Sequence, residues 1–482
     1  MKILLASSEV HPYSKTGGLA DMVGAMGKAM AEAGHRVGVA TPLYRGIRER
    51  FPELKKLDWH MNLPLGPRRV QAEVWTLEPV EGLTIYFINE PEFYQRAGLY
   101  GEKGADYADN AARFIFFSKA VIHLARYLPW QPEVVHANDW QTGLVPLMML
   151  HQKLQEGWGN LPRTCLTVHN LAYQGIFPAA QYALTNLPQD YFNVYGAEFY
   201  RNLNCLKAGI AYADVITTVS PRYAREITLP EYGCGLDDLL RKRHKVLYGI
   251  LNGVDYEEWR TTKNPFLKHS YSVRSLAGKT ENKLDLQTEL GLPTAAEVPL
   301  FGSITRLADQ KGLDIELGAL EEMLSTNMQF VLLGSGAPVY EKAYSELARR
   351  YPNKVAVRIG FDQGLSHRIE AGCDFYVMPS RFEPCGLNQM YSLRYGTIPI
   401  ARVTGGLDDT VVDITEDVEN ANGIKFQEYS ARALAKSMRK ALVLYGDAKW
   451  LRYYRKNAMA ADFSWASMVE EYIQVYTAST GT

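Results

Sequence analysis

The sequence predicts two doubly wound α/β domains, and two observations carry that prediction. Short apolar runs alternate with segments of helical periodicity along most of the chain, which is the order typical of parallel sheets with helical crossovers. The hexapeptide Thr-Gly-Gly-Leu-x-Asp also occurs twice, at 16–21 and at 404–409. Adjacent glycines ahead of a helix let backbone amides face an anion, so we expect one such element in each domain.

The first half of the chain alternates strands and helices. Apolar or alternating runs predict strands at 3–7, 36–41, 70–77, 83–88, 133–136, 163–169 and 214–219. Apolar residues at helical spacing predict helices at 19–33, 107–127, 141–155 and 197–212. The strands 70–77 and 83–88 are expected to pair as an added hairpin.

The pattern changes after residue 253 and then resumes. Polar residues, prolines and charges over 253–298 predict a linker and a surface excursion. The second series predicts strands at 299–304, 329–333, 354–359, 374–378 and 397–401 and helices at 312–325, 340–350, 365–371, 385–395 and 431–444. We therefore assign a first domain to 1–250, a second domain to 251–460 and a terminal helical segment to 461–482.

Composition narrows the class of protein. A chain of 482 residues is too long for one core. Its net charge of −1 argues against a nucleic-acid or polybasic membrane partner. The five scattered cysteines argue against a disulfide framework or a zinc site and favour a reducing compartment. Without a signal peptide or a long apolar run, we expect a cytoplasmic protein that needs no metal.

Ligands of open α/β sheets bind at the carboxyl ends of the strands, and polar residues gather there in the first half. Lys15 precedes the pair Gly17 and Gly18 after the first strand, while Asp139 and His169 each follow a later strand. Taken alone, Asp139 or His169 is more often a helix cap or a satisfied core group, and the glycine pair after Lys15 fits a plain strand–helix turn equally well. Several such polar residues at one edge of the sheet favour a binding site.

The second half carries the more specific signals. Arg306 and Lys311 follow the strand that opens this half, and together they suit the diphosphate of a leaving group; the alternative is a solvated basic turn. Glu383 lies at a strand end before a proline, where a carboxylate can bind sugar hydroxyls or stabilise a positive anomeric centre. The side chain of Cys385 is interpreted as structural, since no His or Asp stands beside it in sequence.

Together these motifs resemble those of the bacterial glycogen synthases and the closely similar starch synthases, retaining glycosyltransferases of the two-domain GT-B class. The matching segments span nearly the whole chain: 15–19, 136–140, 167–171, 250–255, 305–307 with 310–312, 379–387 and 404–407. The resemblance implies two Rossmann-like domains facing across a cleft. It also implies transfer of glucose from ADP-glucose to the non-reducing 4-hydroxyl of an α-1,4-glucan such as glycogen, with retention of configuration.

The resemblance also implies residue roles. The catalytic set is Asp139, His169, Arg306, Lys311 and Glu383. The substrate-binding set is Lys15, Gly17, Gly18, Asp21, Asn252, Cys385, Gly386, Leu387, Thr404, Gly405 and Gly406. The final helix, about 465–476, is expected to cross back onto the first domain. The absence of an amino-terminal extension like that of plastid starch synthases favours the bacterial enzymes.

Several alternatives stay open. Another GT-B glycosyltransferase, a glucan phosphorylase or a non-catalytic glucan-binding module fits the same fold, although a phosphorylase needs pyridoxal phosphate and we expect no cofactor. Retention by a covalent intermediate or by same-face attack is not decided by the sequence; we favour same-face attack because no carboxylate is clearly placed as a nucleophile. The preference for ADP over UDP rests on resemblance alone, and a homo-oligomeric state stays open.

Overall fold

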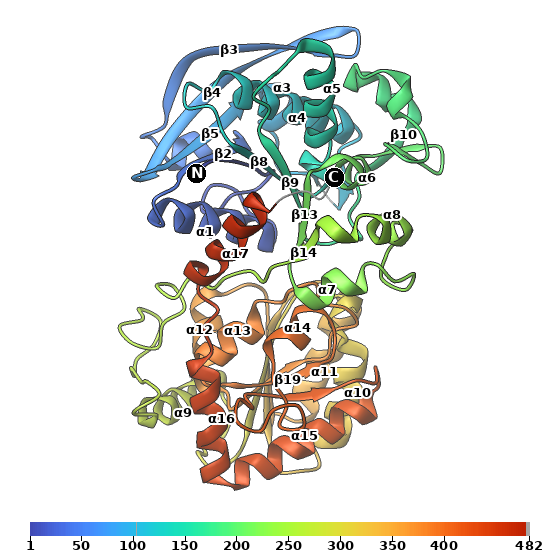
Figure 1. The fold of residues 1–482 in the computed structure, drawn as a ribbon. Coiled ribbons are helices and arrows are strands. Elements are labelled where there is room, and N and C mark those ends of the chain that lie inside the picture. Colours follow the sequence, from blue (N-terminus) through green and yellow to red (C-terminus); the bar gives the residue numbers. More distant parts are fainter. Residues whose placement is uncertain (103, 479–482) are drawn as a thin grey trace. The chain divides into compact units, whose positions relative to one another are not determined.

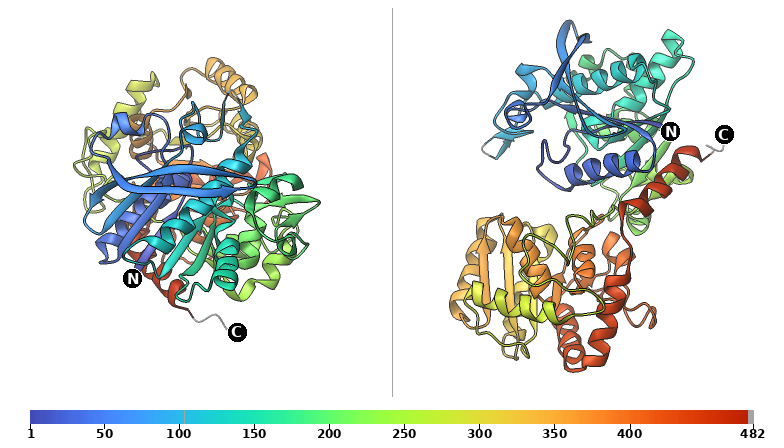
Figure 2. Two further views of the ribbon diagram at one scale, coloured as in Figure 1. Left: turned by 90° about the horizontal axis from the view of Figure 1, so that it is seen from above. Right: turned by 90° about the vertical axis from the view of Figure 1, so that its left-hand side faces the viewer.

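The computed structural model describes residues 1–102 and 104–478, which divide into two compact units. The first comprises Met1–Gly253 and the chain from Trp465 onward, and the second comprises Val254–Ser464. In each unit, helices cover both faces of a central sheet (Figures 1 and 2). No helix among the described residues is long and apolar enough to cross a bilayer.

The main sheet of the first unit has nine strands. In spatial order these are β14 (Leu247–Gly249), β13 (Val215–Thr218), β9 (Arg163–Val168), β8 (Val134–Asn138), β1 (Lys2–Ala6), β2 (Arg36–Pro42), β5 (Leu83–Asn89), β4 (Arg68–Val80) and β3 (Lys55–Leu65). The strands from β14 to β5 pair in parallel, whereas β4 is antiparallel to both β5 and β3. The predicted hairpin is therefore confirmed, with β3 as an additional strand that the pattern missed.

Helices and small sheets complete this unit. The α-helices are α1 (Gly18–Glu32), α2 (Ile47–Arg50), α3 (Pro91–Tyr94), α4 (Asn110–Tyr127), α5 (Val145–Glu156), α6 (Cys205–Tyr212), α7 (Pro221–Glu226), α8 (Asp237–Lys242) and α17 (Trp465–Thr477). Short 3₁₀ turns are η1 (Trp140–Thr142), η2 (Ala179–Thr185), η3 (Gln189–Tyr191) and η4 (His244–Val246). The small sheets are β6 (Gly101–Glu102) with β7 (Ala105–Asp106), and β10 (Ile176–Pro178), β12 (Asn202–Asn204) and β11 (Glu198–Phe199).

The second unit is built on a six-stranded parallel sheet. Its spatial order is β17 (Val355–Ile359), β16 (Gln329–Gly334), β15 (Leu300–Ile304), β18 (Phe375–Met378), β19 (Ile398–Arg402) and β20 (Ile424–Phe426). The helices are α9 (Ala277–Leu290), α10 (Leu313–Met323), α11 (Pro338–Arg350), α12 (Gln363–Gly372), α13 (Asn388–Arg394), α14 (Gly405–Thr410), α15 (Ala431–Gly446) and α16 (Ala448–Ala460), with the 3₁₀ turn η5 (Asp309–Lys311).

The core of the second unit explains why its strands read as continuous apolar runs. Successive side chains of a strand point to opposite faces of the sheet. Phe330 and Leu332 of β16 join one buried cluster with α10 and α15, while Val331 and Leu333 join another with α9 and α12. A parallel sheet buried on both faces needs apolar residues at every position. The predicted strands of both halves are accordingly confirmed, with ends that shift by up to three residues.

The helix predicted over 197–212 is wrong in its first half. The chain there forms β11, a tight turn and β12, and α6 begins only at Cys205. Tyr200 and Arg201 have φ of 47° and 61°, which a helix cannot contain. Asn204 then caps α6, because its side chain accepts the amide of Lys207.

The linker predicted over 253–298 is also wrong, because Val254–Val298 belongs to the second unit and contains the helix α9. The pattern hid this helix because its buried face is largely polar. Lys283 is buried and bonds Asp374 across 2.7 Å, and the ammonium of the buried Lys279 donates to Thr397 and to the carbonyl of Ala371. Buried charges are tolerated where they are paired and hydrogen-bonded, so α9 is held without an apolar stripe.

Candidate active site

In the first unit, Asp139 connects the ends of two neighbouring strands. It follows β8 with φ of 55°, an unusual backbone conformation for a residue with a side chain. Its carboxylate accepts the amide of His169, after β9, across 2.8 Å. Burial, with a smaller contribution from the nearby Glu9, raises the pKa of Asp139 to about 7 against the opposing effect of the amides of His169 and Asn170. Near neutral pH this carboxyl group therefore exists in both protonation states.

His169 lies beside Asp139 and is neutral. Burial lowers the pKa of His169 to about 3. Its Nε2 lies 3.0 Å from Oδ1 of Asn138, whose own amide group donates to the carbonyl of Ala6. Nε2 is then the donor in this contact, which leaves Nδ1 of His169 as an acceptor. The structure brings together Asp139 and His169, two of the predicted catalytic residues.

His136, the last residue of the strand predicted at 133–136, lies within β8 and has a different environment. It is fully buried, and its two ring nitrogens bond the hydroxyls of Tyr476 at 2.7 Å and Thr167 at 2.5 Å. Burial lowers the pKa of His136 to about 3. Both ring nitrogens are occupied, so this histidine is a satisfied core group that fastens α17 to the sheet.

The first glycine pair is organised by Glu9, a residue that the sequence reading missed. The buried carboxylate of Glu9 accepts the amides of Thr16 and Gly17 and the hydroxyls of Thr16 and Tyr100. Two amides of the predicted anion cradle are thus already used within the protein. The only feature of the sequence that could have indicated Glu9 is the presence of an acidic residue between the first strand and the glycine pair.

Lys15 and Asp21, on either side of this turn, form an ion pair of 2.7 Å. Lys15 is exposed, and Asp21 lies in the first turn of α1, as do Gly18 and Leu19. The exposed lysine and the amide of Gly18 are the anion-binding groups left on this turn. The structure thus gathers Lys15, Gly17, Gly18 and Asp21 at one strand end.

Asn252 stands out for an unsatisfied atom. Its side chain is buried, yet its Oδ1 has no hydrogen-bond partner among the described residues. A buried amide oxygen without a protein partner costs free energy and can accept a hydrogen bond from a bound hydroxyl.

In the second unit, Lys311 and Glu383 form an ion pair of 2.6 Å at the carboxyl ends of β15 and β18. The hydroxyl of Ser380 also donates to Glu383 across 3.0 Å. Gly312 makes the approach possible: it has φ of 72°, and a Cβ at this position would lie 2.0 Å from the carbonyl oxygen of Pro379. Only glycine lets η5 come this close to the segment that carries Glu383.

Arg306 lies on the same edge of the sheet and is available to a ligand. It follows β15, its side chain is exposed, and its guanidinium makes no bond to any described residue. Because five of its N–H groups can donate in a fixed planar arrangement, an anion with several oxygens is its natural partner.

The second glycine pair supports the Glu383 segment from the other side. The amide of Gly406 donates to the carbonyls of Glu383 and Pro384 at 3.2 and 3.1 Å. A Cβ on Gly405 would lie 1.9 Å from the carbonyl oxygen of Glu383, and one on Gly406 would lie 2.1 Å from that of Cys385. The pair therefore positions this segment, and its predicted contact with substrate stays a prediction. The hydroxyl of the neighbouring Thr404 is buried without a partner in the described chain.

Cys385, Gly386 and Leu387 precede a helix that starts later than expected. We predicted a helix from 385, but α13 begins at Asn388. Gly386 has φ of 72°, which ends any helical run before it. Cys385 is buried, and its carbonyl and that of Gly386 accept the side-chain amide of Gln389. The amides of this turn, at the same edge as Glu383, stay predicted substrate ligands.

Phe361 is a further residue that the sequence reading missed. It follows β17 at the carboxyl edge of the same sheet, and its side chain is 87% exposed, the most exposed large apolar group among the described residues. An aromatic face in water beside an anion-binding edge is typical of a site for a nucleotide base.

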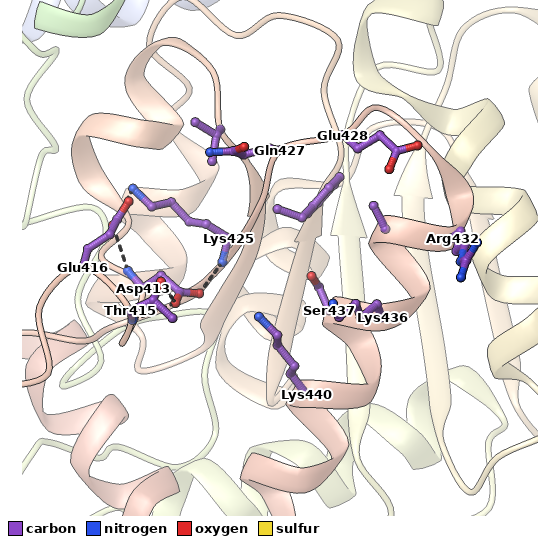
Figure 3. Close-up of a pocket in the computed structure, with 13 residues that line it drawn as sticks. Asp413, Thr415, Glu416, Lys425, Gln427, Glu428, Arg432, Lys436, Ser437 and Lys440 are labelled. Atoms are coloured by element: carbon purple, nitrogen blue, oxygen red, sulfur yellow. Dashed lines mark hydrogen bonds and ion pairs between the residues drawn. The ribbon is translucent and has the colours of Figure 1, made fainter.

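A cavity of about 540 Å³ in the second unit is lined by other residues. It is formed by the segment 413–416, the end of β20 and the exposed face of α15, including Arg432, Lys436 and Lys440 (Figure 3). None of the predicted site residues lines it. The basic side chains of α15 do not converge on a common point (Figure 3), so the cavity does not compete with the strand ends as a candidate site.

The raised pKa of Asp139 gives a stability prediction with a definite sign. Between about pH 4 and pH 7 the folded protein holds a proton on Asp139 that the unfolded chain releases, so wild-type stability falls as the pH rises. Asp139→Asn removes this dependence. We expect the melting temperature of the variant, relative to wild type, to rise between pH 5 and pH 7.5. A constant difference across this range would contradict the assigned pKa.

Comparisons with known proteins bear on both units. The starch synthase catalytic domain matches residues 2–242, and the model described as glycosyl transferases group 1 matches 292–458. A glycogen synthase of Anaeromyxobacter sp. strain Fw109-5 is 46% identical over 477 residues and covers 99% of each chain. A glycogen synthase of Koribacter versatilis is 43% identical, covering 99% of this chain and 98% of its own.

Solved structures agree. The catalytic domain of starch synthase IV from Arabidopsis thaliana, bound to ADP and acarbose, has a TM-score of 0.89 and 34% identity, covering 100% of this chain and 99% of its own. A sucrose-phosphate synthase from Thermosynechococcus elongatus, at 18% identity and a TM-score of 0.61, shares the fold alone, with 98% of each chain covered. The chain therefore belongs to the family of glycogen and starch synthases, hexosyltransferases with the two-domain, Rossmann-like GT-B fold.

Proposed function

We propose that this protein transfers glucose from ADP-glucose to the non-reducing 4-hydroxyl of an α-1,4-glucan, with retention of configuration. The observation that carries the proposal is the ion pair of Lys311 and Glu383, with the unpartnered guanidinium of Arg306 at the same sheet edge. This arrangement offers cations to a diphosphate beside a carboxylate for a sugar. Relatives named glycogen synthase and a starch synthase structure with ADP and acarbose support the choice of donor and acceptor.

The second unit supplies the groups that act on the donor. As the bond to ADP breaks, negative charge develops on the diphosphate and positive charge on the glucose ring. Arg306 and Lys311 stabilise the diphosphate without a metal ion, and Glu383 binds the donor sugar. The ion pair with Lys311 and the bond from Ser380 hold Glu383 in one orientation before the donor arrives. The turns at Gly386–Leu387 and Thr404–Gly406, the latter holding the Glu383 segment, complete this side.

The first unit supplies the groups on the side of the transferred glucose and the acceptor. Lys15 and the amide of Gly18 contact the donor, and Asn252 offers its unsatisfied oxygen to a hydroxyl. The amide of His169 is already donated to Asp139, so the backbone carbonyl of His169 remains to orient the sugar. Ionised Asp139 stabilises positive charge on the ring. It is held by two amides, which suits an electrostatic role and same-face attack better than nucleophilic attack.

Removing either cation tests the role of the diphosphate site. We expect Arg306→Ala to lower kcat by about 100-fold or more, which corresponds to ~3 kcal/mol of lost transition-state stabilisation. We expect Lys311→Ala to do the same, with an added loss of stability because Glu383 is left unpaired. Steady-state kinetics with ADP-glucose and glycogen measures both effects. Arg432→Ala, an exposed arginine on α15, is the matched control, and near-normal turnover of Arg306→Ala would refute the assignment.

Phe361 is proposed to stack on the adenine of the donor. Loss of one base–aromatic contact costs ~1–3 kcal/mol, so we expect Phe361→Ala to raise the KM for ADP-glucose about tenfold or more while kcat changes little. Phe361→Tyr keeps an aromatic face and should keep the wild-type KM. An unchanged KM in the alanine variant would remove Phe361 from the site.

Transfer itself is tested with labelled donors and a glycogen primer. We expect label from ADP-glucose in precipitable glucan, less label from UDP-glucose at equal concentration, and loss of label when the product is digested by an enzyme specific for α-1,4 bonds. Phosphate in place of the donor should release no glucose 1-phosphate, which separates the protein from a glucan phosphorylase. No incorporation from either donor would favour a non-catalytic glucan-binding protein.

A further inference from the structure

Arg402 is the last residue of β19, and none of the assignments above uses it. Its Nη1 donates to the carbonyl of Arg381 across 2.6 Å and, more weakly, to that of Ser380 across 3.4 Å. Its Nε donates to the carbonyl of Gln427 across 3.1 Å. One guanidinium therefore joins the segments that follow β18 and β20, the two neighbours of the strand on which it stands.

The segment that Arg402 holds also carries Glu383. It forms no helix or strand, so its carbonyls depend on donors from elsewhere in the chain. Gln310 donates its side-chain amide to the carbonyl of Phe382 across 3.2 Å, and the amide of Gly406 donates to that of Glu383. The carbonyls of the two residues before Phe382 have Arg402 as their donor. Because a charged donor makes a shorter and stronger hydrogen bond than a neutral one, the 2.6 Å contact is the main side-chain support of this backbone.

A second set of contacts orients Arg381, whose carbonyl Arg402 binds. Arg381 forms an ion pair of 3.1 Å with Asp314, and the hydroxyl of Tyr429 donates to the same carboxylate. The guanidinium carbons of Arg381 and Arg402 lie 4.4 and 5.6 Å from the centroid of the Tyr429 ring, at cation–π distance. Asp314 lies in the first turn of α10, just after η5, so this ion pair joins the same two segments as the ion pair of the candidate site, with the charges exchanged. Both of its side chains are half exposed, so its own contribution is small and the contacts of Arg402 carry more of the support.

We propose that Arg402 is a positioning residue for glucosyl transfer, which touches no substrate and acts by fixing the backbone from which Glu383 meets Lys311. The inference rests on the proposed function, which gives Glu383 its role on the donor sugar. A group that stabilises a transition state must be held within about 0.5 Å of its productive place. Since Arg402 holds the backbone of Glu383 and not the donor, its loss should lower kcat and leave the KM values for ADP-glucose and glycogen nearly unchanged.

A double-mutant cycle tests whether Arg402 acts through Glu383. With ADP-glucose and glycogen, we expect Arg402→Ala to lower kcat about tenfold in the otherwise wild-type protein. In the Glu383→Gln background, which has already lost the carboxylate, the same change should lower kcat less than about twofold. Arg402→Lys keeps the charge but replaces a planar pair of donors by one point, so its kcat should lie between those of wild type and Arg402→Ala. The lysine variant also keeps the test available should the alanine variant fold poorly.

Arg368→Ala is the matched control for a loss of stability. Arg368 also donates from Nε and from one Nη, in its case to Glu289 of α9 across 2.8 Å, and it lies outside the Glu383 segment. We expect its melting temperature to fall like that of Arg402→Ala while its kcat stays near wild type.

The outcomes are distinguishable. Wild-type kcat in Arg402→Ala would overturn the inference. Equal fold losses in both backgrounds of the cycle would also overturn it, because Arg402 would then act independently of Glu383. A raised KM with an unchanged kcat would do the same, since it is expected of a residue that contacts substrate. Absent transfer by the wild-type protein would instead refute the proposed function, and the inference with it.

Discussion

The geometry of the donor side depends on one constraint, the contact of backbone with backbone around the segment Pro379–Cys385. Glycines approach this segment from two elements: Gly312 meets the carbonyl of Pro379, and Gly405 and Gly406 meet those of Glu383 and Cys385. At these three positions a Cβ would lie between 1.9 and 2.1 Å from a carbonyl oxygen of the segment, far inside contact distance. The backbone of this segment is thus confined on both sides. This packing holds Glu383 in the position from which it pairs with Lys311.

The two units differ in the charge states of their candidate site residues. In the second unit, Lys311 and Glu383 are paired and the exposed Arg306 is left for a ligand, so these three residues together carry one excess positive charge. In the first unit, burial keeps His169 neutral and brings the pKa of Asp139 to about 7. An anionic leaving group and a cationic sugar ring are the two charges of a glycosyl transfer, and the proposed assignment gives each to the unit with the suitable electrostatics.

The sequence was sufficient for the parts of the fold that depend on apolar periodicity. Strands buried on both faces, such as β15 and β16, are continuous apolar runs and were predicted, whereas the short edge strands β14 and β20 were not. α9 was missed because buried lysines and amides replace its apolar stripe, and the hairpin β11–β12 was missed because its turn uses Tyr200 and Arg201 in place of Asn and Gly. These failures share one cause: tertiary contacts override the local pattern.

The candidate site, like the fold, could be predicted from the sequence only in part. Residues at strand ends, such as Asp139, Lys311 and Glu383, are marked by their position after apolar runs. Glu9 was not found because its role depends on the folding of the turn that follows it and on Tyr100, 91 residues away, and Phe361 because exposure is not readable from sequence. The support that Gly406 gives to Glu383 is likewise a contact between distant segments.

The route of the chain has a consequence for biosynthesis. The first unit is completed by α17, whose Tyr476 is buried against His136 in the middle of its sheet. Residues 254–464 are translated in between, so the first unit lacks its last helix throughout the synthesis of the second. Until that helix is made, the imidazole of His136 lacks the phenol of Tyr476 that it bonds in the folded unit.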